Sequence, residues 1–124
     1  MGEFSGKVAL VTGSSSGIGE AVARRLSALG ASVVINSATS VDAGRRIAAE
    51  LGAEAIYVQA DIADKAAGER LLAATLGRFG RLDILVNNAG WTTVVPHHDL
   101  AALTDEIFAR TFEVNVAGTW MLTK

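Results

Sequence analysis

The sequence predicts an α/β fold, a doubly wound parallel β-sheet with helices on both faces. Short segments rich in Val and Ile alternate with longer segments whose apolar residues have helical spacing. Short, nearly continuous apolar segments are typical of strands buried on both faces. Their alternation with helices indicates right-handed βαβ crossovers. We therefore expect strand order 3-2-1-4, with a ligand crevice at the carboxyl ends of the first and fourth strands.

Four segments are predicted strands, because each is short and consists mainly of Val, Ile and Leu. The first strand precedes a glycine-rich turn, and each of the others follows a predicted helix or precedes polar residues. The predicted strands are residues 7–12, 32–36, 54–59 and 82–87.

Helices are predicted between these strands from apolar stripes at helical spacing. The first begins near Ser16, and Gly30, Gly52 and Gly80 follow the three helices as stop signals. A fourth helix is predicted from Thr104, a suitable N-cap, after a loop at 90–102. The stripes are Ile18, Val22, Leu26 and Leu29, then Val41, Ile47, Ala48 and Leu51, then Leu71, Leu72, Thr75, Leu76 and Phe79.

Composition favours one globular domain over residues 1–124, since 50% of the 124 residues are hydrophobic and 19% are charged. A net charge of -2 gives no reason to expect nucleic acid or an anionic membrane as a partner. No apolar segment approaches the roughly 20 residues of a membrane span. The absence of cysteine excludes disulfides and thiolate chemistry. With no apolar signal region at the N-terminus, we expect a cytoplasmic protein.

A glycine-rich turn follows the first predicted strand. Gly13, Gly17 and Gly19 have the spacing Gly-x-x-x-Gly-x-Gly, with serines between the first two. Glycines permit a tight turn and a close approach of ligand or backbone. The helix that follows directs free N–H groups and the positive end of its dipole at this corner, which favours a pyrophosphate. The alternative is a glycine-rich turn that binds no ligand.

The ends of the other strands carry polar residues. A sheet that binds NAD usually has an acidic residue after the second strand, and neither Asn36 nor Ser37 is acidic, which favours NADP over NAD. Asp61 follows the third strand; it either accepts a hydrogen bond from an adenine or caps the third helix, for which Asp64 is the better candidate. The amides of 87–90 either bond to the backbone across the turn after the first strand, where the glycine lets a sugar approach the main chain, or only join loops.

Four motifs in this order resemble the classical short-chain dehydrogenases/reductases. They are "TGSSSGIG" at 12–19, Asp61, "NNAG" at 87–90 and "VNVAG" at 114–118. The resemblance extends from Lys7 to the last residue and implies a Rossmann-like fold with the strand order above. It identifies the chain with the N-terminal, cofactor-binding half of a family member.

The resemblance implies a binding site for NADP or NAD, assigned residue by residue. The glycine-rich turn would surround the pyrophosphate and adenosine ribose, Ser37 would lie by the adenosine 2′ position, and Asp61 and Ile62 would meet the adenine. The "NNAG" residues would line the ribose and the first turn. The implied cofactor-binding residues are Gly13, Ser15, Ser16, Gly17, Ile18, Gly19, Ser37, Asp61, Ile62, Asn88, Ala89 and Gly90.

Asn115 resembles the asparagine of the family's catalytic tetrad; the alternative is an amide that merely distorts its helix. The family's catalytic Ser and its Tyr-x-x-x-Lys pair would lie beyond Lys124. Tyr57 is the only tyrosine, has Asp61 in place of the lysine four residues later, and is expected to be a core residue. His97 and His98 are adjacent without an evident third ligand, so we expect no metal.

The expected function is hydride transfer between a nicotinamide and a small carbonyl or alcohol substrate. Two alternatives remain: a non-catalytic NAD(P)-binding fragment, and a half-protein that depends on a partner. The "NNAG" motif argues against an epimerase or dehydratase with the same cleft. In the family the last helix frequently serves subunit association, so a homo-oligomer through that helix is also expected.

Overall fold

The computed structural model describes residues 2–89 and Glu106. In this described part seven elements alternate, and their strands form one parallel sheet in the order β3-β2-β1-β4, as predicted. Glu106 is helical, and the rest of the predicted loop and fourth helix lies outside the described residues. The elements are β1 (Val8–Val11), α1 (Gly17–Ala28), β2 (Ser32–Ser37), α2 (Val41–Leu51), β3 (Ala55–Gln59), α3 (Lys65–Phe79) and β4 (Ile84–Val86).

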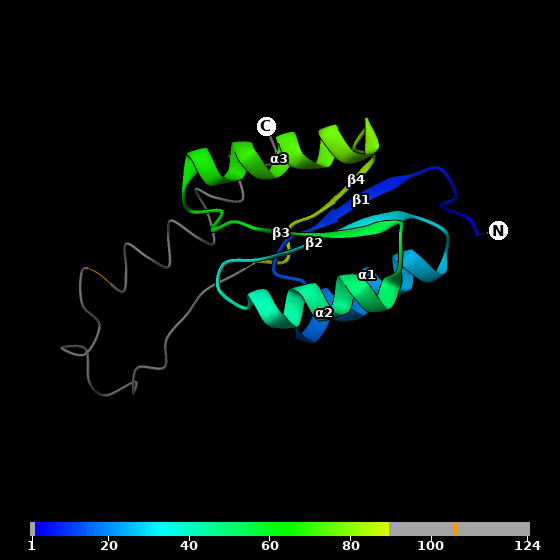
Figure 1. Ribbon diagram of the computed structural model, residues 1–124, viewed down its shortest axis with the longest axis horizontal. Coiled ribbons are helices and arrows are strands. Elements are labelled where there is room, and N and C mark those ends of the chain that lie inside the picture. The colour runs from blue at the N-terminus through cyan, green and yellow to red at the C-terminus, as the bar shows by residue number, and fades with distance from the viewer. Residues whose placement is uncertain (1, 90–105, 107–124) are drawn as a thin grey trace.

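The described elements form three layers, with α1 and α2 on one face of the sheet and α3 on the other (Figure 1). Because side chains alternate along a strand, each face has its own apolar cluster. Leu10 and Val34 pack with Leu71 of α3, whereas Val11 and Ile35 pack with Ile47 of α2. The doubly wound arrangement predicted from the sequence is confirmed. In this part of the chain no helix has the length and apolar character needed to cross a membrane.

Burial differs between the inner and the outer strands. Val11 of β1 pairs with Ile35 of β2 on one side and with Val86 of β4 on the other. All of β1 and nearly all of β2 are buried, as expected, but β3 and β4 are only partly buried. The expectation that all four strands are buried on both faces is therefore wrong for the outer two, because each pairs on one side only among the described residues.

Helix ends follow the predicted signals. Asp64 is the N-cap of α3, and its side chain accepts a hydrogen bond of 3.0 Å from the amide of Ala66. Gly80 ends the same helix in the left-handed conformation, with φ of 79°. The interpretation of Asp64 as the cap of the third helix is confirmed.

Two residues of the predicted apolar stripes are exposed. Ile18 is 77% exposed and Leu76 is 51% exposed. In α1 the residues facing the sheet are Gly19 and Ala23, four positions apart, so Ile18 is turned away from the core. The expectation that Ile18 begins the buried stripe is therefore wrong.

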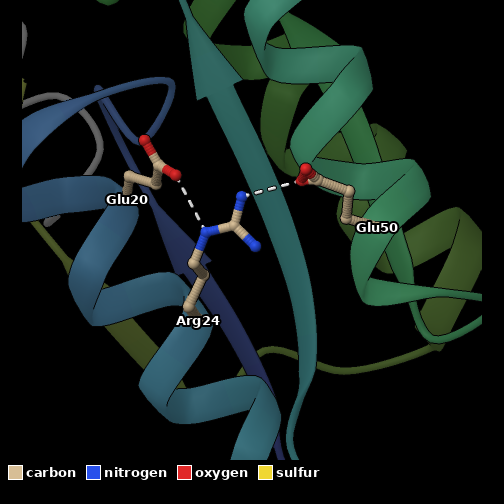
Figure 2. Close-up of polar contacts among 3 residues, drawn as sticks. All are labelled: Glu20, Arg24 and Glu50. Carbon is tan, nitrogen blue, oxygen red and sulfur yellow. Dashed lines mark hydrogen bonds and ion pairs between the residues drawn. The ribbon is translucent and has the colours of Figure 1, made fainter.

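An ion-pair cluster joins α1 to α2 on the outer surface. The guanidinium of Arg24 contacts Glu20 one turn earlier at 2.8 Å and Glu50 of α2 at 3.0 Å (Figure 2). All three side chains are between 30% and 46% exposed, so solvent screens the attraction and each pair contributes little to stability. The cluster aligns the two helices rather than stabilising the fold strongly.

Candidate functional site

A polar cavity of about 420 Å³ opens at the carboxyl ends of the strands. It is the location that the strand order predicts, since the direction of winding reverses at β1. Most of the residues predicted to bind a cofactor line it: Gly13, Ser15, Ser16, Ser37, Asp61, Ile62, Asn88 and Ala89. The structure thus brings together residues from four separate strand ends.

The three glycines of the first turn have different roles. Gly13 has a φ of 63°, and a Cβ there would lie 2.9 Å from the Cα of Ala89. A Cβ on Gly19 would lie 2.5 Å from the side-chain nitrogen of Asn88, so this glycine permits close packing inside the protein. Gly17 also has a positive φ, 59°, but a Cβ there meets nothing within 4 Å. Only Gly17 combines a left-handed conformation with open space at the start of α1.

The start of α1 has no side-chain cap. Ser16 is the N-cap in an extended conformation, and its hydroxyl makes no capping hydrogen bond. The first helical bond, from the amide of Glu20 to the carbonyl of Ser16, is 3.2 Å long. The amides of the first turn, which precede Glu20, have no hydrogen-bond partner within the helix. They directly follow Ser15 and Ser16, which line the cavity. Ile18 and Gly17 do not line the cavity.

Asn36 is a structural residue at the cavity wall. Its side-chain oxygen accepts a 3.2 Å hydrogen bond from the amide of Gly13, and its nitrogen donates to the carbonyls of Val58 and Ala60, both at 3.1 Å. It is 2% exposed. All of these groups belong to the protein backbone, so Asn36 joins the ends of β1, β2 and β3. Of the two residues predicted near a 2′ position, Asn36 has both side-chain polar atoms bonded to the backbone, whereas the hydroxyl of Ser37 bonds to that of Tyr57.

Thr12 joins the glycine-rich turn to the segment that follows β4. Its hydroxyl oxygen accepts hydrogen bonds from the amides of Asn88 and Ala89, at 3.1 and 3.0 Å. The side chain of Asn88 donates in turn to the carbonyl of Gly13 at 3.0 Å. Thr12 is fully buried. The interpretation of the "NNAG" amides as groups that bond across the first turn is confirmed for Asn88.

The wall formed by the end of β2 contains hydroxyl groups and no charge. Ser37, Ala38, Thr39 and Ser40 line the cavity in sequence. Arg45 and Arg46 are exposed on α2 and are not among the described lining residues. Ala38, Thr39, Ser40 and Ala60 were missed as lining residues, and the signal that finds them is their place directly after a strand.

Asp61 is the one charged residue among the described lining residues. Its carboxylate accepts a 3.0 Å hydrogen bond from the amide of Ala63, which turns the chain into α3. Ile62 beside it is 4% exposed and belongs to the apolar cluster below the cavity. The wall formed by β3 therefore presents a carboxylate next to an apolar surface.

Several predicted residues lie outside the described part of the chain. These are Gly90 of the "NNAG" motif and Asn115, together with His97 and His98. The last helix, to which subunit association was assigned, lies outside it apart from Glu106. In the described part, residues 2–89 and Glu106, no three His, Cys, Asp or Glu side chains gather as they would around a metal ion.

Comparison with known proteins agrees with these features. The family model of short chain dehydrogenases matches residues 7–124. The protein named "granaticin polyketide synthase putative ketoacyl reductase 2" of Streptomyces violaceoruber is 53% identical over 94% of this chain and 46% of its own length. Versicolorin reductase 1 of Aspergillus parasiticus is 42% identical, over 98% of this chain and 46% of its own.

A solved structure shows the same fold. The crystal structure of 3-ketoacyl-(acyl-carrier-protein) reductase from Brucella melitensis, complexed with NADH, superposes with a TM-score of 0.90 at 41% identity. The match covers 98% of this chain and 48% of that one. The chain thus spans about half the length of the relatives it matches. Since the family model covers nearly all of the sequence, the chain belongs to the short-chain dehydrogenase family.

Proposed function

We propose that this chain is the coenzyme-binding half of an NAD(P)-dependent oxidoreductase, and that its cavity holds the adenosine and diphosphate parts of the coenzyme. The observation that carries the proposal is Gly17, where a positive φ and an open side at the uncapped start of α1 lie next to a polar cavity. A family relative crystallised with NADH supports it.

The residues present fit a dinucleotide. The unpaired amides of the first turn of α1 suit a diphosphate, because backbone N–H groups and the helix dipole both favour an anion. The hydroxyls of Ser15 and Ser16 add hydrogen-bond donors at the same side of the cavity. Across it, Asp61 offers an acceptor for an adenine amino group, with Ile62 against the ring. A bound nicotinamide coenzyme would supply the hydride chemistry.

The choice between the two coenzymes depends on the end of β2. A carboxylate there would accept a hydrogen bond from a ribose 2′-hydroxyl and would repel a 2′-phosphate. Ser37, Thr39 and Ser40 present hydroxyl donors instead. We therefore infer a preference for NADPH over NADH, with Ser37 at the 2′ position.

The reaction proposed for the full-length protein is hydride transfer between the nicotinamide and a carbonyl or alcohol substrate, in the cytoplasm. Names of the relatives support a reductase, as in the ketoacyl reductase and versicolorin reductase. Asn115 as a catalytic residue, Gly90 as a coenzyme contact and association through the last helix belong to this proposal. The second candidate, binding without turnover, is distinguished by whether the protein with bound coenzyme transfers hydride to a carbonyl substrate.

Calorimetric titration of the protein with NADPH and NADH tests the proposal. Gly17→Leu places a side chain in the open space at the start of α1, and we expect it to abolish binding. Gly80→Leu is the matched control, because Gly80 also has a positive φ, 79°, and open space around it but lies at the far end of α3. Both variants carry a similar strain of about 1–2 kcal/mol.

The proposal predicts that Gly80→Leu retains the wild-type Kd although it loses stability. Unchanged binding in Gly17→Leu, or no binding of either coenzyme by the wild type, contradicts the proposed site. Binding without hydride transfer to any carbonyl substrate supports the second candidate, a binding module.

A further inference from the structure

A pair of hydroxyl groups lies at the end of β2. The hydroxyls of Ser37 and of Tyr57 on β3 are 2.6 Å apart. Tyr57 pairs with Ile35 and Ser37 with Gln59, so the two are diagonal neighbours on one face of the sheet. Ser37 lines the cavity, and Tyr57 lies behind it, packed into the apolar cluster under α2.

The ring of Tyr57 is held by α2. Gly44 of that helix is buried, and a Cβ there would overlap the Cε1 and Cδ1 atoms of the ring. The ring therefore lies directly against the helix backbone at the one position without a side chain. This packing fixes where the phenolic oxygen lies, and through the hydrogen bond it fixes the hydroxyl of Ser37.

One of the two O–H groups of this pair is not used in the hydrogen bond between them. Two O–H groups share one hydrogen bond, and among the described residues neither hydroxyl has a second partner. A phenol is more acidic than an aliphatic alcohol and is the better donor, so Tyr57 donates to Ser37. The proton of Ser37 then remains available on the cavity side, and the bond from Tyr57 polarises that hydroxyl and strengthens it as a donor.

We propose that Tyr57 is a positioning residue for coenzyme selectivity, which acts by orienting the Ser37 hydroxyl toward the 2′-phosphate of NADPH. This inference rests on the proposed function of the cavity. A donor to a phosphate makes a charge-assisted hydrogen bond, which is about twice as strong as one to a neutral hydroxyl. The pair therefore favours a 2′-phosphate over a 2′-hydroxyl, even though no lysine or arginine is among the described lining residues.

Tyr57→Phe tests this, because the variant keeps the ring against Gly44 and removes only the hydroxyl. We expect the Kd for NADPH to rise about ten- to a hundredfold, the loss of one charge-assisted hydrogen bond, with the Kd for NADH little changed. Ser37→Ala is expected to give the same loss, and the double variant no further loss, since the two hydroxyls act as one donor.

Ser32→Ala is the matched control. Ser32 lies at the other end of β2, where its hydroxyl bonds to Glu54 at 2.9 Å, so its removal tests whether any lost hydroxyl on this strand alters binding. The inference predicts unchanged constants for both coenzymes in this variant.

Three results overturn the inference. One is an unchanged NADPH-to-NADH ratio in Tyr57→Phe, and another is an equal weakening of both coenzymes, which indicates a purely structural role. The third is additive losses in the double variant, which mean that the hydroxyls act independently. If the wild type binds both coenzymes, these outcomes leave the proposed function intact, whereas a wild type that binds neither refutes both.

Discussion

Thr12→Val removes the hydroxyl that joins the glycine-rich turn to the segment after β4, while it keeps the shape of the side chain. The variant loses the two hydrogen bonds that the hydroxyl oxygen accepts from the amides of Asn88 and Ala89, at 3.1 and 3.0 Å, and the longer one, of 3.4 Å, that the hydroxyl donates to the carbonyl of Val86. At about 1 kcal/mol for each of the two shorter bonds, with a further penalty for donors left unpaired, the expected loss is about 2–3 kcal/mol. Thr12 is fully buried, so water does not replace its oxygen at that place.

Urea denaturation monitored by circular dichroism measures this loss as a lower midpoint with an unchanged slope. Thr12→Ser is the matched control, since it keeps the oxygen and removes one methyl group, which costs about 1 kcal/mol. We expect the order wild type, Ser, Val from most to least stable, and NADPH binding to weaken most in the Val variant. A Val variant as stable as the Ser variant refutes the role assigned to the hydroxyl.

Two further predictions concern packing and pH. Gly19→Ala places a Cβ against the side-chain nitrogen of Asn88 and the carbonyl oxygen of Gly13, so we expect the free energy of unfolding to fall by about 1–3 kcal/mol in the same urea assay. Gly77→Ala on α3 is the control; its Cβ lies in open space, so we expect the free energy of unfolding to rise slightly. The guanidinium of Arg81 and the amide of Val8 lower the pKa of Asp83 below its usual value, so the carboxylate contributes stability above about pH 4 that is lost as the pH falls through the lowered pKa. Denaturation at several pH values is expected to show that the stability difference between the wild type and Asp83→Asn becomes smaller in acid, and a difference that stays constant contradicts this role of Asp83. Equal effects of Gly19→Ala and Gly77→Ala on the free energy of unfolding contradict the packing role of Gly19.

The order of the strands and the position of the cavity were predictable because they follow from the alternation of segments. Parallel strands joined by right-handed crossovers leave few topologies, and the residue after each strand necessarily lies at the same edge of the sheet. Asp64 as a cap was predictable in the same way, from its distance to the following helix. Such features depend on local sequence and on a general rule of connection.

The roles of Asn36, Ile18 and Tyr57 were not predictable, because each depends on the relative placement of elements. Asn36 bonds to the backbone of Val58 and Ala60, and this pairing depends on the placement of β3 beside β2, which no local pattern encodes. Ile18 is exposed because the rotation of α1 turns Gly19 toward the sheet. Tyr57 contacts Ser37 only through a diagonal pairing, and its ring is held by a glycine on a helix that precedes it in the chain.

The structure of the protein with bound NADPH tests the central claim most directly. The account predicts the diphosphate against the amides at the start of α1, beside Gly17, with the 2′-phosphate within hydrogen-bond distance of the Ser37 hydroxyl. A coenzyme bound elsewhere, or a cavity that stays empty at saturating NADPH, contradicts it.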